Sequence, residues 1–288
     1  LRSSLNVSAG AGKIGSDEIV QISSILGGRE DGILVVPTDI LSDIMTWFNC
    51  PSRTVLMINR IRAMAVDGGS FFLAMFGGER AGKVYDMPAP SIVAGTKLRK
   101  PDNWIEQVQD LVDDINARLG TSFILCRRIT DDIELVAVES ASAENFQMFI
   151  KGEGLAFGLI DGYLLFATSE KVLFEMCSSN AKKTEKELSW PSSVRVSGTS
   201  SLAWVDLGED GERVSFGQTL KDGLNVWKLA VSVQAQTPEL VRIRKNLDFA
   251  EDVLDAIRPA RTITFDLDSS CGFLCGPFVI GASSVGKR

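Results

Sequence analysis

The sequence contains no histidine. Imidazole is the only side chain whose ordinary pKa lies near neutrality, so its absence removes the usual proton shuttle of catalysis. Ser-His-Asp and Cys-His nucleophile systems are excluded, as is every zinc site that needs imidazole. The chemistries that remain are paired carboxylates, a serine activated by lysine, and metal ions held by oxygen.

Long apolar runs and an excess of basic charge are also lacking. No run reaches the ~18 residues of a transmembrane helix. Because the sequence opens at Leu1 rather than Met, we expect that a segment upstream has been removed. Lys plus Arg number 30 and Asp plus Glu number 37, a net charge of −7. That balance opposes binding to nucleic acid and to anionic lipid, so no nucleic-acid partner is expected.

Cysteines are few and scattered. There are five, with no CxxC pair, so neither a structural zinc nor a thioredoxin-like site is expected. Cys271 and Cys275 would lie ~13 Å apart along one strand, too far for a disulfide unless a turn falls between them. Buried thiols that pack as small apolar side chains are the simpler interpretation. No metal and no cofactor are predicted.

What the sequence does have is apolar content sufficient for a core, 45% of its 288 residues. Composition divides the chain into four parts. Residues 1–16 are rich in Ser, Gly and Ala and predict a flexible lead-in. Residues 17–178 form a first α+β half, 179–199 a polar linker or exposed loop, and 200–288 a second α+β half.

Apolar periodicity predicts the elements within these halves. Strands are expected at 33–37, 70–76, 91–98, 123–129, 133–139, 155–160, 163–168, 202–207, 262–267 and 272–280. Helices are expected from Thr38, from Ser52, over 102–119 with Asp102 as N-cap, over 143–150, from Ser169 and from Pro238. Asp161-Gly162, between two apolar runs, is the strongest hairpin signal.

Strands that follow one another through hairpins favour an α+β fold, with mostly antiparallel sheets packed against amphipathic helices. The element order of residues 33–98 is similar to that of 202–280. This similarity predicts an internal β-α-α-β-β repeat.

Four segments resemble chemical motifs, and each has a simpler structural interpretation. Gly10 to Gly15 lacks the first Gly and the Ser or Thr of a phosphate loop. Ser179 to Lys182 fits S-x-x-K without the other motifs of that family. Asp206 to Gly217 has Gly217 where a calcium loop needs Glu. Asp131, Asp132 and Glu134 form an acidic cluster at a hairpin tip, where solvated turn residues are expected.

Two features could form contacts with a partner. The apolar stripes that begin at Trp104 and Leu240 are typical of core packing and could also form a binding face. The loop from Gly77 to Pro90 carries Arg80, Lys83 and Tyr85 among glycines, which makes it a candidate contact loop. No residue is assigned a catalytic, cofactor-binding or metal-binding role.

The segment Asp161-Gly-Tyr-Leu-Leu-Phe-Ala-Thr-Ser169, followed by Val172-Leu173, resembles the hairpin signature of a bacterial envelope family of unknown function, the DUF3352-type proteins. The order of elements around it and Val205-Asp206-Leu207 are similar to that family too. The resemblance spans about residues 33–280 and carries no catalytic residues. It implies an extracytoplasmic protein with a membrane anchor upstream of Leu1.

The sequence therefore predicts a non-enzymatic bacterial envelope or secreted α+β protein that acts by binding or as a structural module. Its expected partner is an unknown protein or an apolar ligand. The alternatives are a carboxylate-based hydrolase with a cleft between the halves and an apolar-ligand carrier with its ligand between sheet and helices. A periplasmic or cell-envelope location is expected, and a cytoplasmic one stays open.

Overall fold

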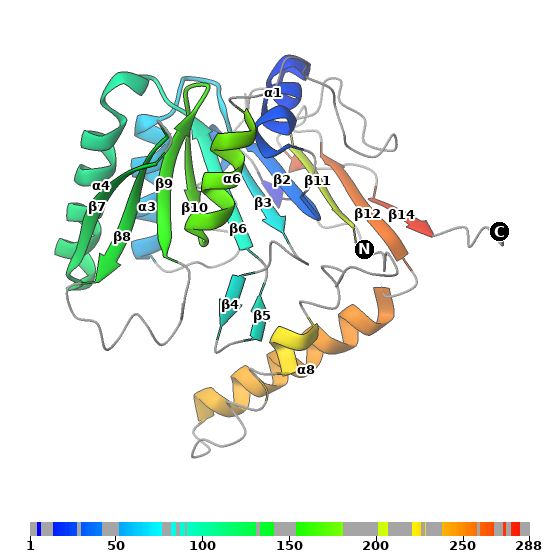
Figure 1. Cartoon of the computed structure of the whole chain (residues 1–288). Coiled ribbons are helices and arrows are strands. Elements are labelled where there is room, and N and C mark those ends of the chain that lie inside the picture. The colour runs from blue at the N-terminus through cyan, green and yellow to red at the C-terminus, as the bar shows by residue number, and fades with distance from the viewer. Residues whose placement is uncertain are drawn as a thin grey trace.

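The computed structural model describes residues 5–6, 14–27, 30–41, 52–76, 82–84, 87–89, 91–130, 133–140, 154–180, 201–206, 221–225, 228, 238–257, 260–267, 273–274 and 278–282. Within these residues one large sheet carries helices on both faces (Figure 1).

The large sheet has ten strands, and every pairing of neighbours described in it is antiparallel. In spatial order the strands are β14 (Phe278–Ala282), β12 (Ala260–Leu267), β11 (Ser201–Asp206), β2 (Gly32–Pro37), β3 (Ser70–Phe76), β6 (Ser91–Lys97), β10 (Tyr163–Ala167), β9 (Leu155–Ile160), β8 (Ile133–Ser140) and β7 (Phe123–Thr130). Two small sheets pair β1 (Leu5–Asn6) with β13 (Phe273–Leu274), and β4 (Gly82–Val84) with β5 (Met87–Ala89). The prediction of an α+β fold with antiparallel sheets is confirmed.

Helices α1 (Ser16–Leu26) and α6 (Glu170–Asn180) pack on one face of the sheet. Helices α3 (Ser52–Met64) and α4 (Trp104–Leu119) pack on the other. The short 3-10 helix η1 (Thr38–Ile40) comes before α3 in the chain, and η3 (Pro101–Asn103) comes directly before α4. Helix α8 (Pro238–Ile257) carries Asp248 and Glu251, and the amine of Lys228 forms an ion pair with each of these carboxylates.

The alternation of each strand divides the core into two layers. Phe72, Tyr163 and Leu165 point towards α1 and α6 and are fully buried there. Val138, Phe157 and Leu164 point towards α4 and are buried with its Trp104, Val108, Leu111 and Val112. Because strands β2, β3, β9 and β10 are covered on both faces, they are apolar on both sides, which explains why their sequences run as nearly continuous apolar stretches.

The predicted hairpin is confirmed at Asp161-Gly162. Both residues have positive φ, 49° and 79°, which is the geometry of the tight two-residue turn that Asp-Gly favours. Ser169 is confirmed as the cap of α6, since its hydroxyl accepts a hydrogen bond from the amide of Val172 at 3.3 Å.

Three local predictions are wrong. Residues 272–280 do not form one strand: β13 and β14 belong to different sheets, and Gly276 and Pro277, which disfavour strands, separate them in sequence. Asp102 does not cap α4, because it lies inside η3 and Asn103 is the N-cap residue. Thr38 does not cap a helix either: its hydroxyl donates to the carbonyl of Gly69 instead.

The two predicted halves share the sheet, because β11 of the second half pairs with β2 of the first. Of the predicted lead-in, the structure describes β1, paired with β13, the buried Ile14, Gly15 and Ser16, which begins α1. The internal repeat stays a prediction. The predicted helix over 143–150 also stays a prediction, because it lies outside the described residues. The predicted 179–199 linker lies outside them too, except for its start. Among the helices that the structure describes, none combines the length and the apolarity needed to cross a membrane.

Candidate functional site

A cavity of about 400 Å³ lies between the sheet and the helices α3 and α4, and it is partly open to solvent. Its size falls within the range of small-molecule sites in proteins. The residues around it come from eight helices and strands that are far apart in the sequence. It is therefore a product of the tertiary structure.

The floor of the cavity is the sheet face that points towards α4. Four phenylalanines dominate this floor: Phe71, Phe123, Phe157 and Phe166. Phe157 and Phe166 face each other across β9 and β10, with ring centroids 5.1 Å apart and planes tilted by 49°. Ala94 of β6 lies in register with Phe166, and its small side chain leaves space above the strand.

The roof is formed by one face of each helix. Helix α3 contributes Ile61 and Met64, and α4 contributes Leu111, Val112 and Ile115. These positions recur three or four residues apart, the spacing that places side chains on one helix face. In α4 the stripe was predicted from the sequence as core packing or as a binding face, and it serves both to fill the core and to line the cavity.

Polar groups are nearly missing from the walls. Thr96 is the one lining residue with a polar side chain among those described, and its hydroxyl donates to the carbonyl of Ser70 at 2.9 Å. No charged side chain of the described residues lines the cavity. The described lining residues therefore offer a molecule apolar contact, and none of them carries a charged group that could move a proton.

Outside the cavity an ion pair joins the two roof helices. The carboxylate of Asp114 on α4 lies 3.3 Å from Nε of Arg60 on α3 and 2.7 Å from Nε of Arg118. The hydrogen bond from Arg118, and then the charges of both arginines, hold the pKa of Asp114 below its ordinary value. The Arg60–Asp114 pair connects α3 and α4 at the surface, where both charged groups stay in contact with water.

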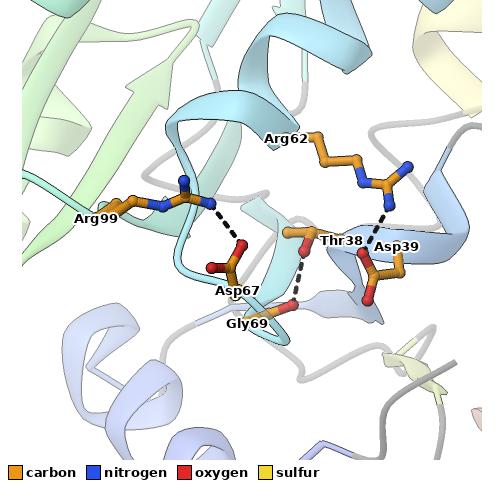
Figure 2. A network of polar contacts seen from close by, with 6 residues as sticks. All are labelled: Thr38, Asp39, Arg62, Asp67, Gly69 and Arg99. Carbon is orange, nitrogen blue, oxygen red and sulfur yellow. Dashed lines mark hydrogen bonds and ion pairs between the residues drawn. The ribbon is translucent and has the colours of Figure 1, made fainter.

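A second hollow, about 370 Å³, lies on another face of α3. Figure 2 shows its polar contacts: Arg62 pairs with Asp39 at 2.9 Å, and Arg99 pairs with Asp67 at 2.5 Å. All four side chains are at least two-fifths exposed, and such surface pairs contribute at most about 1 kcal/mol each. Each cation already has an anion beside it, so this hollow offers no surplus charge to a ligand.

A third group of polar side chains lies on the opposite face of the sheet, under α1. The carboxylate of Glu18 accepts hydrogen bonds from the amide and the hydroxyl of Ser70, at 3.0 and 2.7 Å. The amine of Lys97 lies 5.7 Å from the centre of the Tyr163 ring. Burial and the charge of Glu18 raise the pKa of Tyr163. A carboxylate bonded to a serine could accept its proton, but Ser70 is only 1% exposed and thus closed to a substrate.

The predicted contact loop is largely outside the described residues, which exclude Arg80 and Tyr85. Lys83 lies in β4, opposite Pro88 of β5. Of the acidic cluster only Glu134 is described, and it forms an ion pair with Arg127. The described cysteines, Cys126 and Cys177, are free thiols, and no group of described residues could hold a metal ion through three or more Cys, Asp or Glu ligands.

The hydrolase alternative requires an enclosed pair of acids with raised pKa. Among the described acids whose pKa is clearly shifted, Asp114 and Asp248, the shift is downwards, because arginine or lysine lies beside each. The alternative stays a prediction.

The sequence predicted a ligand space between sheet and helices but none of the residues on the floor of the cavity. Their only sequence signal is large side chains on both faces of each strand.

Comparison with models of protein families, with curated proteins and with solved structures finds no match to this chain. The resemblance to DUF3352-type proteins therefore stays a prediction.

Proposed function

We propose that this protein binds an apolar small molecule in the cavity between the sheet and the helices α3 and α4, and acts without catalysis. The observation that carries the proposal is the composition of the walls: about 400 Å³ of space bounded by aromatic and aliphatic side chains, with no charged group among the described lining residues. Binding sites for small molecules are mostly apolar clefts of this size.

The solvation of the walls supports the same function. The cavity is partly open to solvent, so water can reach its apolar walls. Water gains little there, because ordered water needs two to four polar partners. An apolar ligand that displaces this water removes apolar surface from solvent, which is worth about 25 cal/mol per Å².

We propose in addition that the protein works in the bacterial envelope or is secreted. This part of the proposal is supported by the motif from Asp161 to Leu173 alone. Localisation of the full-length gene product in cell fractions tests it, and recovery in the cytosolic fraction would overturn it.

A pair of matched substitutions tests the ligand site. Ala94→Phe places a ring into the cavity from β6, whereas Ala117→Phe places the same ring on the exposed surface of α4, outside the cavity. Purified protein is unfolded and refolded to remove bound lipid, and binding of the neutral fluorophore N-phenyl-1-naphthylamine is titrated.

We expect the wild type and Ala117→Phe to bind alike, and Ala94→Phe to bind at least tenfold more weakly. Filling real space adds apolar contact, so the unfolding free energy of Ala94→Phe should be equal to or above that of the wild type. If Ala94→Phe is instead destabilised by the 1–3 kcal/mol of overpacking, and the wild type takes up no fluorophore, the space is packed and the proposal is wrong.

A further inference from the structure

The residues that line the cavity extend across six neighbouring strands, and their course can be followed through the strand register. It begins on β3 and β6, where Phe71 lies opposite Thr96. It crosses β10 and β9 where Phe166 lies opposite Phe157, and reaches β8 and β7 at Val138 and Phe123. At each step the lining residues lie further along the strands, so the course is diagonal to them.

The dimensions follow from the sheet. β3 and β7 are five strand spacings apart, and neighbouring strands lie about 4.8 Å from one another, so the course spans roughly 24 Å across the strands and is longer along its diagonal. The volume of about 400 Å³ counts the positions open to the centre of a water molecule, and spread over that length it has a mean cross-section of at most about 17 Å², about 4 Å on a side. Adding a water radius of about 1.4 Å on each side gives a free width of about 7 Å between the walls. Non-bonded carbons approach to about 3.5–4.0 Å, so this width accommodates one hydrocarbon chain and leaves too little room for two chains side by side.

The chemistry of the walls restricts the ligand further. A charged group inside them would lose its hydration without a partner, at a cost of several kcal/mol. The hydroxyl of Thr96 is already bonded to the carbonyl of Ser70. Any polar head group must therefore stay at the open side of the cavity, and the part inside is hydrocarbon.

We propose that the ligand is a single unbranched acyl or alkyl chain that lies across the sheet under α3 and α4, with its head group in solvent. This rests on the proposed binding function and names the ligand class of the same site. If each methylene occupies about the 30 Å³ of a water molecule, the cavity holds about a dozen of them, enough for part of its course and not for the whole.

Competition against N-phenyl-1-naphthylamine tests the proposal, with unbranched fatty acids and fatty alcohols of eight to sixteen carbons kept below their micelle concentrations. We expect affinity to rise about fourfold per methylene, the equivalent of about 0.8 kcal/mol, and to level off at about twelve to fourteen carbons. Acid and alcohol of one length should agree within about threefold, because the walls carry no charge. Dodecanoate should bind at least tenfold more tightly than adamantaneacetate, which has as many carbons in compact form.

Variants of the β7 and β8 end sharpen the test. Val138→Phe should shorten the cavity and move the plateau to chains two to four carbons shorter, while octanoate binds as in the wild type. Leu155→Phe, on the neighbouring strand, should do the same if Val138→Phe fails to fold. Equal loss at every chain length would contradict a linear site.

The outcomes separate the two proposals. If adamantaneacetate binds as tightly as dodecanoate, and Ala94→Phe abolishes both, the site exists but the linear ligand is wrong. If neither chain nor compact molecule displaces the fluorophore from the wild type, both proposals fail.

Discussion

Adding one methyl group at Gly95 should destabilise the protein through contacts with two identified side chains. Gly95 lies in β6, and a Cβ built there would lie 2.6 Å from Cζ of Phe72 and 2.7 Å from Cδ2 of Leu165. Phe72 and Leu165 are both 0% exposed, and they pack between the sheet and the helices α1 and α6. Neither can move away into solvent, so the surrounding core must shift.

The magnitude is the balance of two effects. Overpacking of a buried site costs about 1–3 kcal/mol. Replacing Gly by Ala where the backbone is regular strand returns about 0.4–1 kcal/mol, because the unfolded chain loses freedom. We therefore expect Gly95→Ala to lower the unfolding free energy by about 1–2 kcal/mol, with a fall in melting temperature of about 2–4 °C per kcal/mol.

Urea unfolding followed by circular dichroism measures the effect, with Gly154→Ala as the control. At Gly154 a Cβ would meet only the Glu170 carboxylate, at 3.8 Å. Gly154→Ala should therefore change the unfolding free energy by less than about 0.5 kcal/mol. Combining Gly95→Ala with Phe72→Leu, which removes Cζ and Cε1, should recover at least about 0.5 kcal/mol relative to additivity. A Gly95→Ala protein as stable as the wild type would refute the assigned packing of β6 against Phe72.

Two further predictions concern titratable groups. Burial raises the pKa of the Cys177 thiol to about 12 from 9.0, so its thiolate at about pH 8 is on the order of a thousandfold rarer. Iodoacetamide should label Cys177 in urea and leave it nearly unlabelled in the native state by peptide mass spectrometry; equal labelling would place it at the surface. The pKa of Asp114 is lowered by folding, so its ion pairs stabilise the protein above the ordinary value of 3.8 and lose that effect as the pH falls through the folded pKa. Asp114→Asn should therefore melt below the wild type at about pH 7, by a difference that narrows as the pH falls below 3.8, and a difference independent of pH would assign the effect to shape rather than charge.

Most strands and helices of this fold could be predicted because their signals are local. The sequence prediction for β3, Ser70 to Phe76, matches the observed strand from end to end. Asp161-Gly162 defines its hairpin because these residues tolerate positive φ. Local signals failed where alternatives compete at short range, as at Asp102, where a 3-10 turn with Pro101 at its start displaced the expected cap.

The candidate site could not be predicted residue by residue. Phe71 and Phe123 are more than fifty residues apart in the sequence, and each looks like an ordinary core residue. A strand covered on both faces shows no period-two pattern, so the sequence does not indicate on which face of the sheet each of its residues lies. The strand order β3-β6-β10-β9-β8-β7 is what places these side chains along one course under α4.

By itself, the sequence determined the kinds of elements, their antiparallel hairpins and the chemistries closed to the protein, because propensity, turn geometry and the lack of imidazole are properties of neighbouring residues or of composition. Only the tertiary structure decided that a cavity lies beside Ala94. A cavity is the volume left between side chains of several strands and two helices that are distant in the sequence, so no local pattern encodes it.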